Sequence, residues 1–234
     1  MSARRRIGTL GLVAVCLFAA PAVPAVAQVE VSVEAGYTGS EGINASQSHI
    51  VLGQVYNSLD IPGGGSFGLT VGGFFTENWE AEFLWHRQLT SLQASNPSPA
   101  LKLATQDVDN YHGNIVYNFG ARESKLRPFA FFGLGATHYA PGDFDPSLPL
   151  SNASARIGSF SKFSTTWGGG VKAFPAPHVG FKGTVRWTPT YIKSDAGGLW
   201  CDPFYPTCWV LADPDYSNQL EFSAGVTFRF GGGR

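Results

Sequence analysis

The stretch from Leu220 to Phe230 alternates apolar and polar side chains without interruption over 11 residues. Its apolar face is bulky and aromatic, while the other face carries Glu221, Arg229 and small or polar residues. A period of two predicts a β-strand, and about 9–11 residues are what a tilted strand needs to cross the hydrocarbon layer of a membrane. The stretch therefore predicts the closing strand of a transmembrane β-barrel, with its apolar face toward lipid and its polar face toward the lumen.

Seven further stretches show this alternation, with varying regularity. They span residues 29–38, 66–75, 79–91, 107–119, 126–139, 160–174 and 179–193. Long connections alternate with short ones, as in bacterial barrels with short periplasmic turns and long external loops. The first long connection, residues 39–65, is rich in Gly, Ser and Asn and is predicted to be a loop. The second is a loop that contains Pro97 and Pro99. The sequence thus predicts an all-β fold, an eight-stranded antiparallel up-and-down transmembrane β-barrel.

The N-terminus has the pattern of an export signal. Residues 4–6 are arginines, residues 7–20 form an apolar run too short to span a bilayer, and Ala25-Val26-Ala27 provides a small-x-small cleavage site. We therefore expect a signal peptide over residues 1–27 and a barrel domain over residues 28–234, located in the bacterial outer membrane after export. Cleavage removes three arginines and no acid, so the formal charge falls from −1 to −4. This mild acidity argues against a nucleic-acid partner.

Five acidic and five basic residues fall on the predicted inward faces. They are Glu30, Glu34, Glu80, Glu82, Glu221, Arg127, Lys172, Lys182, Arg186 and Arg229. Buried charges must be paired, or each costs several kcal/mol, and an eight-stranded barrel is only wide enough inside for side chains. The balanced set predicts a charge network that plugs the lumen. A selective pore is the alternative, since rearrangement of such a network could open a small channel.

The mature chain has two cysteines, Cys201 and Cys208, in an oxidising compartment. We predict a disulfide that closes the loop between them, because two thiols without a nearby histidine make an incomplete zinc site. Four aromatic residues of the same connection are candidate contacts for an external partner, or alternatively anchors at the membrane interface. These residues are Trp200, Phe204, Tyr205 and Trp209.

His86 and His112 fall on inward faces of adjacent predicted strands. A level pair of imidazoles could bind a metal, but we favour histidines that are satisfied by Asn110 and Asn114. No His-Glu-x-x-His run and no phosphate-binding glycine loop occurs. The sequence therefore predicts no metal, no cofactor and no catalytic residue.

Several motifs resemble the small outer-membrane β-barrel family related to the transmembrane domain of outer-membrane protein A and to the opacity porins. They are the export signal, residues 34–37 (Glu-Ala-Gly-Tyr), residues 127–129 (Arg-Pro-Phe) followed by Gly133 and Gly135, and residues 222–230. The resemblance covers essentially the whole mature chain. It implies a C-terminal signal read by the barrel-assembly machinery, at Phe222, Val226, Phe228 and Phe230. The family commonly stops at the last aromatic residue, whereas residues 231–234 follow it here.

Three classes of function fit a membrane barrel. We favour a structural or interaction protein whose four external loops contact surfaces, lipopolysaccharide or partners that the sequence does not identify. The alternative is a narrow porin or a transporter of small solutes or small apolar molecules. An enzyme acting on lipid A is the third, with Ser217 and Asn218 at the rim but no adjacent histidine. A soluble ligand-binding barrel would instead turn its large apolar faces inward.

Overall fold

The structure is a computed structural model. It describes residues 28–41, 43–51, 54–145, 159–192, 200–201, 208–209 and 216–231. The predicted signal peptide therefore lies outside the described residues. Within these ranges, no helix is both long and apolar enough to cross a membrane.

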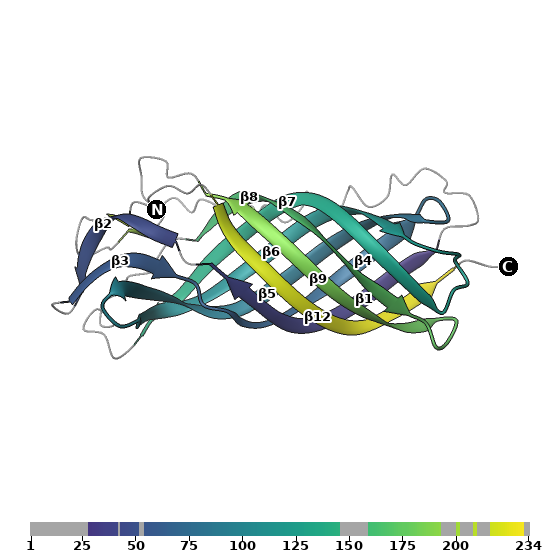
Figure 1. Ribbon diagram of the computed structural model, residues 1–234, viewed down its shortest axis with the longest axis horizontal. Coiled ribbons are helices and arrows are strands. Elements are labelled where there is room, and N and C mark those ends of the chain that lie inside the picture. The colour runs from purple at the N-terminus through teal and green to yellow at the C-terminus, as the bar shows by residue number, and fades with distance from the viewer. Residues whose placement is uncertain are drawn as a thin grey trace, which may run out of the picture.

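Eight long antiparallel strands form a closed wall (Figure 1). They are β1 (Val29–Ser40), β4 (Gly64–Phe74), β5 (Trp79–Pro97), β6 (Leu101–Asn118), β7 (Leu126–Phe144), β8 (Phe160–Ala173), β9 (Val179–Tyr191) and β12 (Tyr216–Phe230). The first and last of them pair from Val29 with Phe230 to Ser40 with Gln219. β5 pairs with both β4 and β6, which closes the ring. The predicted eight-stranded antiparallel barrel is confirmed.

The wall follows the alternation of the sequence. Large apolar side chains such as Phe132, Phe181 and Phe222 point outward and are more than half exposed, at 54, 59 and 56 %. Polar and charged side chains on the alternate positions are buried inside. A protein in water would not leave so many large apolar side chains exposed around its whole wall, whereas a lipid-facing wall requires them.

Aromatic side chains mark both ends of the apolar band. At the end with the short turns, Trp79 and Tyr117 pack with ring centroids 4.8 Å apart, and Phe119 continues the contact at 4.9 Å. At the other end, Tyr191 and Tyr216 pack across β9 and β12 at 5.5 Å. Such girdles are typical of the two interfaces of a membrane barrel.

Three strands extend five or six residues beyond their predicted ends. The loop predicted to contain Pro97 and Pro99 is much shorter than expected, because β5 continues to Pro97 and β6 begins at Leu101, so that only residues 98–100 connect them. β7 likewise continues to Phe144. Above the membrane the outer face no longer has to be apolar, so the alternation that marks the spanning segments ends while the strand pairing continues.

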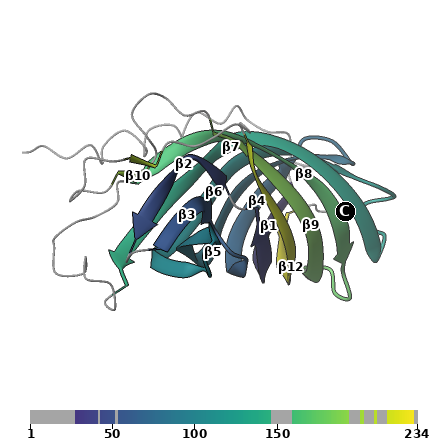
Figure 2. The ribbon, with the colours of Figure 1, turned by 60° about the vertical axis from the view of Figure 1, so that its left-hand side comes forward.

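The prediction of a loop over residues 39–65 is also wrong. This stretch contains β2 (Ile43–Val51) and β3 (Gln54–Asp60), an antiparallel pair of strands. β3 pairs with the upper part of β5, from Tyr56 with Pro97 to Asp60 with Gln93. Figure 2 shows this hairpin beyond the end of the barrel, continuing the sheet of the wall. Hydrogen bonding along β5 compensates for the weak strand propensity of a Gly-, Ser- and Asn-rich segment.

A separate two-stranded sheet lies at the last external connection. It consists of β10 (Trp200–Cys201) and β11 (Cys208–Trp209), in which Cys201 is paired directly with Cys208. The Cα atoms of paired antiparallel residues lie about 4.5–5.5 Å apart, within the range of about 4.4–6.8 Å that a disulfide spans. The disulfide stays a prediction that this backbone pairing favours.

Candidate functional site in the barrel lumen

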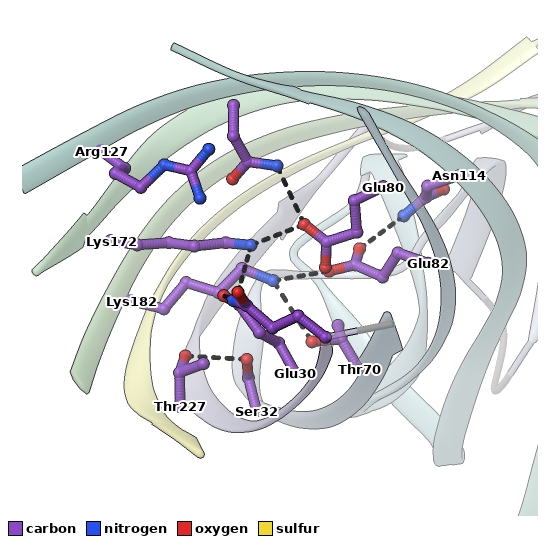
Figure 3. A network of polar contacts seen from close by, with 12 residues as sticks. Glu30, Ser32, Thr70, Glu80, Glu82, Asn114, Arg127, Lys172, Lys182 and Thr227 are labelled. Carbon is purple, nitrogen blue, oxygen red and sulfur yellow. Dashed lines mark hydrogen bonds and ion pairs between the residues drawn. The ribbon is translucent and has the colours of Figure 1, made fainter. Parts of the chain in front are cut away.

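The network nearest the short turns is centred on Lys172 of β8. Its Nζ lies 2.7 Å from a carboxylate oxygen of Glu30 on β1 and 2.7 Å from one of Glu80 on β5 (Figure 3). Glu30 also accepts hydrogen bonds from Arg229 Nε at 3.0 Å and from Gln28 Nε2 at 2.7 Å. The lysine therefore joins opposite sides of the wall across the lumen.

A second lysine, Lys182 of β9, repeats this arrangement. Its Nζ lies 3.0 Å from Glu34 Oε1 and 2.8 Å from Glu82 Oε2, and it donates to Thr70 Oγ1 at 3.2 Å. Asn114 donates to the other oxygen of Glu82 at 2.9 Å. Figure 3 shows both lysines reaching toward the glutamates from the same side of the barrel.

The two lysines are direct cross-strand partners in the β8–β9 ladder. Like charges in such positions are destabilising, yet each ammonium here lies between two carboxylates. Lys172 and Lys182 are almost fully buried, at 1 and 2 % exposure. The glutamates are therefore required to compensate two buried cations, since an unpaired buried charge costs several kcal/mol.

A third ion pair lies further toward the external end. Arg186 of β9 and Glu221 of β12 are cross-strand neighbours, with Arg186 Nη1 2.7 Å from Glu221 Oε2. His86 Nε2 of β5 lies 3.1 Å from the same oxygen. Because β5 adjoins neither β9 nor β12, the contact of His86 with Glu221 also connects the wall across its interior.

Arg127 and Arg229 complete the charged layer at the end with the short turns. Arg127 donates from Nη2 to the backbone oxygen of Glu77 at 3.1 Å, and none of the described residues forms an ion pair with it. The guanidinium of Arg229 lies 3.5 Å from the ring centroid of Phe174. The structure thus brings nine of the ten predicted lumen charges into ion pairs, while the tenth is held by a backbone carbonyl.

The sequence did not indicate that aromatic rings fill the space between these charges. Phe74, Phe129 and Phe131 point inward and are buried. Lys172 Nζ lies 5.5 Å from the centroids of both Phe74 and Phe129, and the Arg127 guanidinium lies 5.6 Å from Phe74. Cations over aromatic faces are attracted to the ring electrons, so these rings are both fillers and partners of the charges. Consecutive aromatics in β7 were the available signal, since one of each neighbouring pair must face inward.

Hydroxyl and amide groups form the next layer. The Thr137 hydroxyl donates to Asn110 Oδ1 at 2.7 Å and lies 3.0 Å from both Ser164 Oγ and Thr190 Oγ1. His112 Nε2 lies 2.9 Å from the same Ser164 oxygen. The partners of the two lumen histidines are thus a carboxylate and a hydroxyl, and differ from the asparagines predicted. Among the described residues, no group of three or more potential metal ligands occurs.

The external end of the lumen is closed by an apolar cluster, which we call the cap. The hairpin β2–β3 and the extensions of β5, β6 and β7 contribute most of its residues. They are Tyr56, Leu59, Ile61, Leu92, Ala94, Leu103, Ala104, Val108, Tyr139 and Ile192. Leu92, Val108 and Tyr139 are fully buried. Burial also raises the pKa of the Tyr139 hydroxyl, because the phenolate would have to be desolvated.

Charged groups return to the outer face where the apolar band ends. Arg87 of β5 donates from Nε and Nη2 to the two oxygens of Asp109 on β6, at 2.7 and 2.8 Å. Trp85 Nε1 donates to the same carboxylate at 3.1 Å. Hydrogen bonding to Asp109 raises the pKa of the Arg87 guanidinium. This ion pair marks the upper limit of the lipid-facing surface on β5 and β6.

The remaining predicted site residues lie on β12 and at the last external connection. The four residues of the implied assembly signal, Phe222, Val226, Phe228 and Phe230, point outward along β12. Trp200 and Trp209 are paired in β10 and β11, whereas Phe204 and Tyr205 lie outside the described residues. None of these positions has a geometry that tests the role predicted for it.

The fold and the filled lumen define a transmembrane β-barrel of the small eight-stranded class. The family model of the outer membrane protein beta-barrel domain matches residues 10–230, so the chain belongs to this family. A search of curated proteins found no match. The protein is located in the bacterial outer membrane.

Solved structures of outer-membrane barrels are similar to this one in fold. OprG from Pseudomonas aeruginosa is 13 % identical with a TM-score of 0.58, over 88 % of this chain and 97 % of its own. A major outer membrane protein from Thermus thermophilus is 11 % identical with a TM-score of 0.56, over 87 and 99 %. Neisserial surface protein A is 14 % identical with a TM-score of 0.53, over 86 and 97 %.

Proposed function

We propose that this protein is a sealed, non-enzymatic barrel whose external end contacts surfaces, lipopolysaccharide or other partners. The filled lumen is the observation that carries the proposal. A charged layer, a hydroxyl layer and an apolar cap follow one another along the barrel axis, and their side chains are almost completely buried. A water path would have to separate ion pairs such as that of Lys182 and Glu82, which lie 2.8 Å apart. A buried charge left without its partner costs about 3–5 kcal/mol.

The external end offers a platform for contact. β5, β6 and β7 project beyond the apolar band, and hairpin β2–β3 widens the sheet on one side. Apolar packing in the cap supports a rigid platform. On this basis we propose that Trp200, Phe204, Tyr205 and Trp209, held by the predicted disulfide, are the contact residues of the last external loop.

Conductance across a planar bilayer tests the sealed lumen. Protein refolded from residues 28–234 and verified as folded should give no discrete openings, while an established porin in the same membrane conducts. Stable openings would overturn the proposal and would mean that the charge network leaves a continuous water path.

Contact through the last loop is tested separately. A variant with the four loop aromatics replaced by serine should lose binding to lipopolysaccharide-coated beads or to cells, while its barrel remains folded. Unchanged binding would remove this loop from the proposal. Lipid A should also be unaltered in cells that express the protein, and a changed mass of lipid A would contradict a non-enzymatic role.

A second candidate, transport of small apolar molecules, is favoured by one observation. The cap consists of packed apolar side chains such as Leu59, Ile61 and Leu92, which an apolar molecule could replace if they separated. A small apolar fluorophore should then bind the refolded protein, and Leu59→Asn should abolish binding. Equal signals from both proteins would remove this candidate.

A further inference from the structure

A groove of about 670 Å³ lies on the outer face of the wall, where β1, β12 and β9 adjoin. Four of its lining side chains are apolar, namely Tyr37, Trp187, Leu220 and Phe222. The ladder orders them by depth, since Tyr37 pairs with Phe222 while Leu220 pairs with Trp187 one step nearer the external end. The groove therefore starts within the lipid-facing band and runs toward the external interface.

The groove exists because Gly39 has no side chain. Gly39 is paired with Leu220, and a Cβ placed on it would meet only the Leu220 backbone oxygen, at 3.8 Å. The ring of Tyr37 lies toward β4, where a Cβ on Gly63 would collide with its hydroxyl. The outer face of β1 thus lacks a side chain at the level where its neighbours Leu220 and Trp187 are large.

The upper end of the groove is polar. Asn218 Nδ2 donates to Glu41 Oε2 at 2.7 Å, and the Glu41 amide donates to the Asn218 backbone oxygen at 3.0 Å. Glu41 is exposed, and among the described residues no basic side chain forms an ion pair with it. A carboxylate at the end of an apolar groove selects a ligand that carries hydrogen-bond donors above a hydrocarbon chain.

We propose that this groove is a binding site for one acyl chain of an acylated-sugar lipid of the outer leaflet. The chain would lie over Gly39 between Tyr37 and Leu220, and hydroxyl or amide donors of the sugar would reach Glu41. The long strand extensions identify this end of the barrel as external, so the groove opens toward the leaflet that contains such glycolipids. The volume is within the range of about 300–1,000 Å³ typical of ligand sites. The site rests on and deepens the proposed contact with lipopolysaccharide, but it is independent of the last loop and of whether the lumen conducts.

Photo-cross-linking locates the lipid. The protein is reconstituted with lipid A that carries a diazirine in one acyl chain, irradiated and digested, and the labelled peptides are identified by mass spectrometry. Label should concentrate several-fold on residues 37–41, 185–189 and 218–222, relative to lipid-facing residues of β6. Even labelling around the wall would mean annular lipid only and would overturn the site.

Two variants and a matched control sharpen the test. Gly39→Leu fills the groove and should reduce the local label several-fold, and Glu41→Ala should do so while leaving the apolar walls intact. Gly113→Leu is the control, since Gly113 faces lipid on β6 and a Cβ there meets no atom within 4 Å. A Gly39→Leu protein that is labelled as strongly as Gly113→Leu would contradict the proposal.

A second lipid tests the headgroup. Phosphatidylcholine with the same diazirine chain has no hydrogen-bond donor in its headgroup, so it should label the groove several-fold less than lipid A does. Equal labelling would overturn the assignment to an acylated sugar. Heat-modifiable migration on gels verifies the folding of each variant, and a misfolded Gly39→Leu leaves Glu41→Ala to decide.

Discussion

The two ends of the lumen are filled by opposite chemistry. Toward the short turns, Lys172 and Lys182 are each held between two glutamates, and the remaining space is taken by polar groups and rings. Toward the external end, the cap contains residues such as Leu59, Leu92 and Val108, packed as in a soluble protein. One closed sheet therefore has a polar interior at one end and an apolar interior at the other.

The difference follows from what surrounds the wall. Within the membrane, alternation must place apolar side chains outward, so the inward positions are polar and have to compensate one another. Above the ion pair of Arg87 and Asp109 the outer face contacts water. Polar side chains therefore point outward there, and apolar side chains point inward. On β6, Lys102 is exposed while Ala104 and Val108 are buried. The level at which a strand changes pattern thus marks the membrane boundary.

The largest effect is expected from removal of one lysine. Lys182→Met leaves Glu34 and Glu82 buried without their cation, so the free energy of unfolding should fall by about 3–5 kcal/mol. Urea unfolding of the refolded barrel in lipid vesicles, followed by tryptophan fluorescence, measures this change.

The double variant Lys182→Met with Glu82→Gln is the control for this prediction. It removes one of the two carboxylates that lost their cation, while Glu34 keeps hydrogen bonds from Thr184 and Ser223 at 2.9 and 3.0 Å. Part of the lost stability should return. A single variant as stable as the wild type would contradict the compensation described for the charged layer.

A smaller and more local effect is expected in the cap. Leu59→Ala removes a side chain that is 1 % exposed and should cost about 2–4 kcal/mol through lost burial and a residual cavity. Because β3 lies at the edge of the wall, hydrogen exchange should accelerate in residues 54–60 and 89–97. Equal acceleration in the membrane-spanning part of β12 would mean that the cap and the charged layer are one cooperative unit.

The rings between the lysines should contribute less. Phe129→Leu keeps an apolar side chain but removes a ring whose centroid lies 5.5 Å from Lys172 Nζ and 5.4 Å from Lys182 Nζ. The loss of stability should be about 1–2 kcal/mol, from two weakened cation–ring contacts and imperfect packing. Phe132→Leu, on the lipid-facing side of the same strand, is the matched control and should change the unfolding midpoint less.

The smallest effect is expected in the β8–β9 ladder, at the level between the charged layer and the cap. The β8–β9 ladder contains the pairs Ser164 with Thr190 and Trp167 with Trp187, but none for Thr165 and Thr166 in this described segment. Pro189 lies opposite this gap and has no amide hydrogen to donate. Thr165 and Thr166 both remain paired with β7, but successive amides of a strand point to opposite neighbours. The amide of Thr165, which lies opposite Pro189, should therefore exchange faster in detergent micelles than that of Thr166. Equal protection from exchange would show that the β8–β9 ladder is hydrogen-bonded here as completely as the rest of the wall.

Much of the spanning wall could be predicted because lipid imposes a strict pattern. The alternation of residues 220–230 defines a strand, its outward face and its place beside β1. The same alternation identified Glu30, Glu82, Lys182 and the other lumen charges as inward. Their individual partners could not be predicted, since they depend on register and on which strands face one another across the barrel. Lys182 contacts Glu34 and Glu82 from two other strands.

The external region could not be predicted for a physical reason. Tyr56, Leu59 and Ile61 are scattered among polar residues, and their burial depends on pairing of β3 with β5 rather than on a local pattern. Gly39 is likewise uninformative in the sequence, because the groove above it needs the large neighbours supplied by β9 and β12.

The accessibility of Thr137 to water tests the filled lumen most directly. Thr137 is fully buried between the charged layer and the cap, and cysteine there is close to isosteric. With Cys201 and Cys208 replaced by serine, Thr137→Cys should resist a small charged thiol reagent until the barrel is unfolded, while Ser161→Cys on the exposed outer face reacts at once. Rapid labelling of folded Thr137→Cys would contradict a sealed lumen.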